Sequence, residues 1–188
     1  MKRSILMMGL TALIFSSTSA FAAGKTVLVK SLAYESPLTI ALRQAQQNRH
    51  ADAFPVLLQY ARYGEKVAQN IVGSYYLAGA GTEPDMVQGL VWMAVSLEQR
   101  EPTWQKNYDA LTSKLTAEQR EQLQKIIDQH IAKYGVKAQL MSCNREAKQI
   151  GSNQKAEFCK KVRDRDRDVQ VVVYEEDAPI PGAEKYRF

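Results

Sequence analysis

The chain has 188 residues, of which 45% are hydrophobic and 24% charged, and its formal net charge is +5. This length and composition predict one globular domain, or one domain with an appended module, rather than a disordered chain. Two cysteines and two histidines are too few for a disulfide-rich scaffold or a four-cysteine zinc site, and they leave little room for a histidine-based centre. The composition therefore favours a protein that is not an enzyme, with no catalytic, metal-binding or cofactor-binding residues.

The first 22 residues have the order of a secretory signal peptide. Lys2 and Arg3 form a basic start, an apolar run covers residues 5–15, and Ala20 and Ala22 are the small side chains that signal peptidase requires. The apolar run is shorter than the roughly 20 residues needed to cross a bilayer. We therefore expect residues 1–22 to be removed, with no transmembrane span after cleavage.

Removal of this segment changes the composition of the mature chain. Cleavage after Ala22 leaves 188 − 22 = 166 residues, and loss of Lys2 and Arg3 lowers the net charge from +5 to +3. No cysteine precedes Cys143, which excludes a lipid-anchored lipoprotein. The signal is of the bacterial type, so we expect a periplasmic protein. In that compartment the small positive charge gives no reason to expect nucleic acid as a partner.

The two cysteines, Cys143 and Cys159, are 16 positions apart. In an oxidising compartment such a pair is expected to form one structural disulfide. A free redox pair and intermolecular bonds are the alternatives, although the absence of Cys-x-x-Cys disfavours a redox catalyst. With Gly151 and Ser152 as a turn signal between them, the cysteines predict a hairpin-like, disulfide-closed module over residues 136–175.

The predicted elements begin with a short β-branched segment, Thr26–Lys30, which is a strand or an ordered arm within residues 23–36. After Pro37 the apolar residues take helical spacing, which continues to Gly135. Helices joined by short turns favour stacked hairpins over a sheet fold, so residues 37–135 are predicted to form one helical domain. The apolar stripes of the six predicted helices cover residues 38–45, 53–61, 67–76, 86–97, 104–115 and 123–134.

Two of these helices have capping signals at their N-termini. Asp85 with Gln88, and Thr116 with Gln119, have the spacing of a capping box. Gly135 stands where the last helix is expected to end. The helix that starts after Thr116 carries apolar residues on one face, so we expect it to cap the end of the helical domain.

A pattern of small, aromatic and acidic residues lies between Ala68 and Leu97. Two glycines allow a tight reversal between helices, an aspartate caps the next helix, and small residues allow the helices to cross closely. The pattern consists of Ala68, Gly73, Tyr76, Gly79, Gly81, Asp85 and Trp92. This segment resembles the Sel-one-like repeat, a relative of the tetratricopeptide repeat, and residues 53–64 resemble the second helix of an earlier, degenerate unit.

The resemblance implies an all-α fold, a short α/α solenoid of stacked helix hairpins with a small disulfide-closed C-terminal segment. It also implies a concave groove for an envelope protein or peptide, without catalytic residues. Tyrosines gather near the repeat, and any left exposed would line this groove. The candidate partner-binding residues are Tyr60, Tyr63 and Tyr75.

The C-terminal region has two further features. Lys155, Lys160, Lys161 and Arg163 form a basic cluster that we interpret as a solvated face. The β-prone segment 169–174 is a possible partner for the strand near the N-terminus, and residues 176–188 are expected to form a loose tail.

The sequence thus favours a non-catalytic periplasmic protein-binding scaffold. The alternative is a cell-envelope enzyme or a peptidoglycan- or β-lactam-binding protein. Sel-one-like proteins with cysteines in every repeat have been linked to β-lactam binding. Here the segment from Ala68 to Leu97 contains no cysteine, which argues against that alternative.

Overall fold

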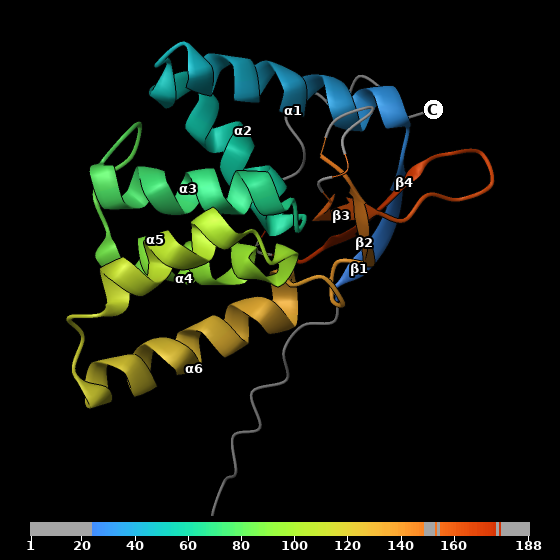
Figure 1. Cartoon of the computed structure of the whole chain (residues 1–188). Coiled ribbons are helices and arrows are strands. Elements are labelled where there is room, and N and C mark those ends of the chain that lie inside the picture. Colours follow the sequence, from blue (N-terminus) through green and yellow to red (C-terminus); the bar gives the residue numbers. More distant parts are fainter. Residues whose placement is uncertain (1–23, 149–152, 154, 176, 178–188) are drawn as a thin grey trace, which may run out of the picture.

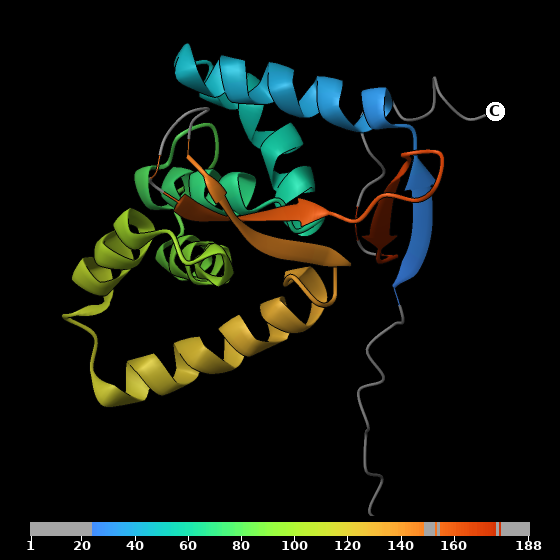
Figure 2. The same cartoon turned by 45° about the vertical axis from the view of Figure 1, so that its right-hand side comes forward.

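The computed structural model describes residues 24–148, 153, 155–175 and 177. The expected signal peptide with Ala20 and Ala22, the turn at Gly151 and Ser152, and most of the expected tail lie outside these residues. Figure 1 shows the helices stacked beside one another, with the strands together at one end of the array, and Figure 2 shows the same separation from another side.

In the described residues, six α-helices form the array, and a 3₁₀ turn follows α4 at Leu97–Gln99. Helix α1 lies along one edge of the array and α6 along the opposite edge, with α2, α3 and α4 between them (Figure 1). Helix α5 packs on α4 and contains no buried residue. The helices are α1 Ser31–Gln46, α2 His50–Arg62, α3 Lys66–Ala78, α4 Met86–Ser96, α5 Pro102–Thr112 and α6 Ala117–Tyr134.

The expectation of an all-α fold is wrong, because the described residues also form two small antiparallel sheets of two strands each. One sheet pairs β1 with β4, so that Val27 faces Val171. The predicted pairing of the segment near Thr26–Lys30 with the segment 169–174 is thereby confirmed. The strands are β1 Lys25–Val29, β2 Met141–Ala147, β3 Lys155–Lys161 and β4 Val169–Val173.

The other sheet is the hairpin of β2 and β3, in which Cys143 stands directly opposite Cys159. The two residues form the predicted disulfide, and the chain has no free cysteine. The bond therefore joins two neighbouring strands at a register position where their side chains already meet.

The first helix begins at Ser31, six residues before the predicted boundary at Pro37. Pro37 cannot donate a backbone hydrogen bond to the carbonyl of Ala33, yet the helix runs through it. Burial explains the earlier start, because Ala33 and Tyr34 are 4% and 3% exposed and pack in the first turn. Tertiary packing here overrides the local preference against proline inside a helix.

The hydrophobic core has two parts. The larger cluster joins α1, α2 and α3 to strand β4, and its fully buried members include Leu57, Val72 and Val171. The smaller cluster joins α4 to α6 through Leu90 and Ile127. Strand β4 is therefore part of the main core.

One residue of the expected tail is buried. Asp177 is 6% exposed, and its Oδ1 accepts a hydrogen bond from the hydroxyl of Tyr134 at 3.2 Å. The Nε of Arg62 lies 3.5 Å from the same oxygen. The interpretation of this carboxylate as part of a loose tail is wrong, since its contacts reach α2 and α6.

Removal of the disulfide is expected to lower the free energy of unfolding by about 3 kcal/mol, the value for a closed loop of this size in the chain-entropy model. The change is the double variant Cys143→Ala/Cys159→Ala, measured by urea unfolding. A reductant should destabilise the wild type by a similar amount and leave the variant unchanged. Equal stability of the two proteins without reductant would contradict this expectation.

Candidate functional site

The turn between α3 and α4 contains the glycines and the aspartate of the repeat pattern. Gly79 ends α3 in the left-handed region with a φ of 65°. Gly81 has a φ of 73°, and a Cβ at this position would lie 2.5 Å from the backbone oxygen of His50. The carboxylate of Asp85 then accepts a hydrogen bond from the backbone N–H of Gln88 at 2.9 Å. The conformation of this turn thus explains why both glycines and the capping aspartate stand at these positions.

The crossing of α3 and α4 depends on small residues. A Cβ on Gly73 would lie 2.6 Å from Cγ of Met93 and 2.8 Å from the carbonyl oxygen of Gly89. Ala68 is completely buried on the same helix. These positions let the two backbones approach more closely than larger side chains allow.

Trp92 connects the repeat to α6. Its ring is 2% exposed and lies 5.3 Å from the ring of His130, edge to face, and 5.3 Å from the ring of Tyr134. Burial lowers the pKa of His130, which favours the neutral imidazole against the tryptophan. The aromatic residue of the repeat pattern therefore anchors the helix that was expected to cap the array.

Loss of the helix cap at Asp85 is expected to lower the free energy of unfolding by less than removal of the disulfide does. The variant Asp85→Ala leaves the N–H of Gln88 without its side-chain acceptor, which should lower the free energy of unfolding by about 1 kcal/mol. Chemical denaturation measures it, with Asp109→Ala as a control because Asp109 is an exposed carboxylate within α5. Equal losses in both variants would argue against a specific cap.

The three candidate tyrosines do not line a groove. Tyr60 and Tyr63 are completely buried and Tyr75 is 8% exposed. The hydroxyl of Tyr60 donates to the carbonyl oxygen of Tyr34, and the hydroxyl of Tyr75 pairs with Nδ1 of His50 at 2.8 Å. Burial also raises the pKa of Tyr63 to about 12. Their interpretation as partner-binding residues is corrected: they pack inside the helical array.

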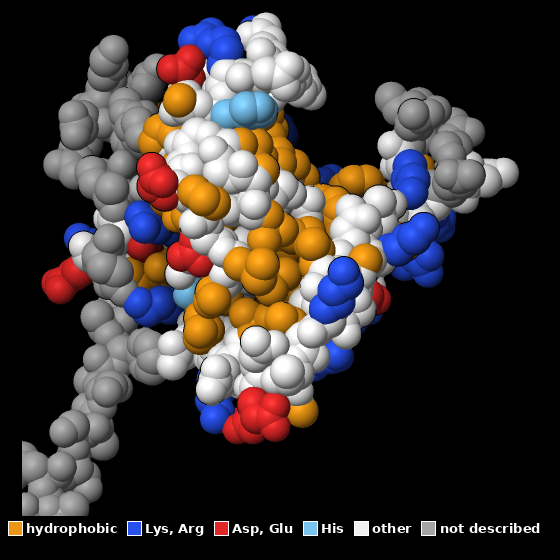
Figure 3. Space-filling view, turned by 90° about the vertical axis from the view of Figure 1, so that its left-hand side faces the viewer, with side chains coloured by type: hydrophobic (Ala, Val, Ile, Leu, Met, Phe, Trp, Pro, Cys, Tyr) orange, Lys and Arg blue, Asp and Glu red, His pale blue; other side chains and the backbone are white. Residues whose placement is uncertain are grey.

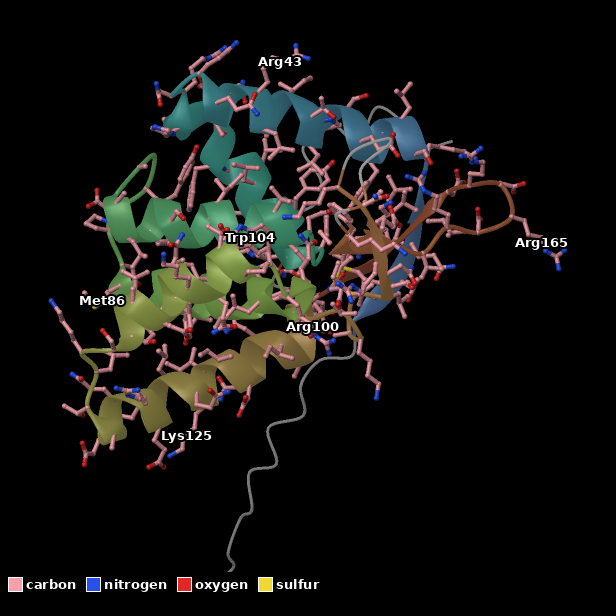
Figure 4. The ribbon with its side chains drawn as sticks, viewed as in Figure 1. Arg43, Met86, Arg100, Trp104, Lys125 and Arg165 are labelled. Atoms are coloured by element: carbon pink, nitrogen blue, oxygen red, sulfur yellow. A yellow bond between two sulfur atoms is a disulfide. The ribbon has the colours of Figure 1, made fainter. Side chains whose placement is uncertain are left out.

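A different surface exposes apolar side chains. Met86 and Val87 are 67% and 47% exposed at the start of α4, and Leu111 is 44% exposed near the end of α5. Figure 3 shows hydrophobic side chains gathered in the middle of the face formed by these helix ends, beside a margin of lysine and arginine. Figure 4 places Met86 at the end of the array away from the strands, and Trp104 on α5. We call Met86, Val87 and Leu111 the apolar face.

Charged groups are buried where the helices meet the strands. The Nζ of Lys66 lies 2.7 Å from Oε2 of Glu98 and 3.0 Å from the side-chain oxygen of Gln69. Lys161 is 9% exposed and donates to the backbone oxygen of Gln139 at 2.8 Å. The interpretation of Lys161 as part of a solvated face is therefore wrong.

Alternation along β3 was the available signal for this burial. Side chains two residues apart lie on the same face of a strand, and Lys161 is two residues beyond the buried Cys159. The sequence reasoning missed the half-buried carboxyl of Glu65 altogether. Glu65 lies directly before α3, and the apolar pattern of the neighbouring sequence does not indicate that its side chain faces inward.

The burial of Lys161 predicts a pH dependence of stability. Desolvation lowers the pKa of this ammonium from 10.5 to about 7, against the attraction of Glu65. Between these values the unfolded chain holds a proton that the folded chain has released, so stability rises with pH in this window. The free energy of unfolding, measured in urea, should therefore rise for the wild type relative to Lys161→Met from pH 7 to pH 10. A constant difference between the two proteins would contradict this sign.

The described residues contain no group of three or more histidine, cysteine, aspartate or glutamate side chains arranged to hold a metal ion. Within the same part of the chain, no helix has the length and hydrophobicity to span a membrane.

Comparison with known proteins gives a likeness to a solved structure. No family model matches the chain, and no curated protein matches it. Among solved structures, the chain is similar to a protective antigen present in uropathogenic Escherichia coli strains, described as displaying an SLR fold, that is, Sel-one-like repeats. The identity is 25% and the TM-score 0.48, over 55% of this chain and 23% of that chain. The chain thus spans less than a quarter of that protein's length.

Proposed function

We propose that this protein is a non-catalytic, periplasmic scaffold that binds a protein or peptide on its helical surface. The observation that carries the proposal is the apolar face at the ends of α4 and α5, where Met86 alone is 67% exposed. Contiguous exposed apolar side chains on a folded domain are typical of a site of protein association.

The local geometry of the repeat supports this proposal. Gly73 and Gly81 meet neighbouring backbone at distances that exclude a larger side chain, so the chain preserves the crossing and the turn of a helix hairpin. The disulfide of Cys143 and Cys159 supports export, because such bonds persist in oxidising compartments.

Crosslinking from defined positions tests the scaffold function. A photoreactive amino acid replaces Met86 or Leu111 in intact cells, and Arg43 serves as the control because Figure 4 shows it on α1 at a distant edge of the array. We expect the same protein to be captured from both positions of the apolar face and not from Arg43. Capture of the same protein in equal amounts from all three positions would oppose the proposal. Capture of a different protein from each position would also oppose it.

Charge introduced on the same surface provides a second measurement. The double variant Met86→Asp/Leu111→Asp should keep the melting temperature of the wild type, since both side chains are exposed, and should lose the captured partner. Incubation with labelled penicillin and with peptidoglycan distinguishes the alternative of an envelope enzyme or cell-wall-binding protein. Retention of either ligand together with unchanged partner capture in the double variant would contradict the scaffold function.

A further inference from the structure

A second region of the molecule contains a cavity of about 230 Å³. It lies between α1, the turn before α3, and strands β3 and β4, away from the apolar face. Drug-sized ligands occupy pockets of about 300–1,000 Å³, so this volume suits a smaller molecule, of the size of one amino acid. Its lining includes Tyr34, Leu38, Glu65, Lys161, Arg163 and Val169.

Two residues of opposite charge, Glu65 and Lys161, line this cavity without contacting each other, and the other charged residues of the lining are Glu35, Lys160 and Arg163. Glu65 and Lys161 attract each other strongly enough for each to affect the pKa of the other. Both lie in the described part of the chain, and no ion pair joins them there. Both residues belong to the lining of the same cavity.

Both groups retain capacity for another partner. The carboxylate of Glu65 accepts a hydrogen bond from the hydroxyl of Tyr34 at 2.8 Å, and a carboxylate has about four acceptor sites. The ammonium of Lys161 donates to the backbone and side-chain oxygens of Gln139 at 2.8 and 3.1 Å, which leaves one of its three N–H donors. The neighbouring Arg163 is already engaged with Glu35.

Burial makes it unfavourable for Glu65 and Lys161 to remain charged without a close counter-charge. Desolvation raises the pKa of Glu65 and lowers the pKa of Lys161 to about 7, because each charge has lost water without gaining a close counter-charge. A ligand with a positive group beside Glu65 and a negative group beside Lys161 would supply both counter-charges at once. Leu38 and Val169 form an apolar part of the wall.

We propose that this cavity binds a free α-amino acid, with its ammonium group toward Glu65 and its carboxylate toward Lys161. An apolar side chain of the ligand packs against Leu38 and Val169. This site is separate from the apolar face. Failure of the scaffold function in its test would therefore not contradict the amino-acid site, and failure of the amino-acid site would not contradict the scaffold function.

Titration calorimetry of the purified, disulfide-bonded chain at pH 6, below the pKa of about 7 that burial gives Lys161, tests the charge requirement on the wild type. The probe is L-leucine, with N-acetyl-L-leucine, which lacks the ammonium, and L-leucinamide, which lacks the carboxylate. We expect saturable binding of leucine, and affinities at least about tenfold lower for both analogues. No saturable binding of leucine, or equal binding of either analogue, would overturn the proposal.

Variants locate the binding. Glu65→Gln and Lys161→Met should each lower the affinity for leucine at least about tenfold, with thermal unfolding as the check on folding. Lys155→Gln is the matched control, because Lys155 lies on the same strand, is exposed and does not line the cavity, and it should bind leucine as the wild type does. Undiminished binding by folded Lys161→Met would place the ligand elsewhere. If a variant fails to fold, the comparison of ligands on the wild type still decides the question.

Discussion

Replacement of Trp92 by alanine is expected to lower the free energy of unfolding by about 3–5 kcal/mol, the range for truncation of a buried aromatic side chain. The ring is 2% exposed and lies against the rings of His130 and Tyr134. Its removal takes a large apolar area out of the interface between α4 and α6. Urea unfolding followed by circular dichroism measures the loss.

The chain contains a matched control for this substitution. Trp104 is the only other tryptophan, and it is partly exposed on α5, a helix with no buried residue. Trp104→Ala should cost less than about 1 kcal/mol, as is usual for substitutions away from a core. If Trp92→Ala does not fold, Trp92→Phe should give a folded protein of intermediate stability. Similar losses for both alanine variants would show that Trp92 does not anchor α6.

Neutralisation of Glu98 is expected to destabilise the fold by about 3–5 kcal/mol, because loss of one partner leaves the other buried charge uncompensated. The side chain of Lys66 is 0% exposed, and its Nζ lies 2.7 Å from Oε2 of Glu98. The same oxygen accepts the backbone N–H of Val136 at 2.9 Å, so the variant Glu98→Gln also weakens the start of the segment that leads to the hairpin. Chemical unfolding at pH 7 measures the effect.

A surface pair of the same length is the control. Lys125 and Glu121 also lie 2.7 Å apart, but their side chains are 67% and 72% exposed, and Figure 4 shows Lys125 on the outer side of α6. Glu121→Gln should therefore cost less than about 1 kcal/mol. The double variant Lys66→Met/Glu98→Gln should recover much of the lost stability, since it removes the buried charge. Equal losses in Glu98→Gln and Glu121→Gln would refute the role of burial.

The elements with local determinants could be predicted from the sequence. Gly79 and Asp85 specify the turn after α3 within a few residues, and Thr116 with Gln119 forms the reciprocal capping box expected at the start of α6. These signals act through nearby backbone groups, so they do not depend on the rest of the fold.

Residues with long-range determinants could not be assigned in this way. The burial of Tyr60 depends on its contact with Tyr34 of α1, a helix whose start before Pro37 has no local signal. Alternation along β3 places Lys161 on the face of Cys159, but the partner of its ammonium, Gln139, lies 22 positions earlier and has no local signal. The apolar face and the charged cavity therefore became visible only when the elements were packed together.

The pairing of Val27 with Val171 has a consequence for the order of folding. A ribosome completes β1 long before β4, because their paired residues are separated by 171 − 27 = 144 positions. The helix hairpins contact close neighbours in sequence and can form early, whereas closure of such a long loop comes with an added entropic cost and slows folding. Strand β1 therefore stays unpaired until β4 has also been made. The folded molecule then holds these two strands side by side.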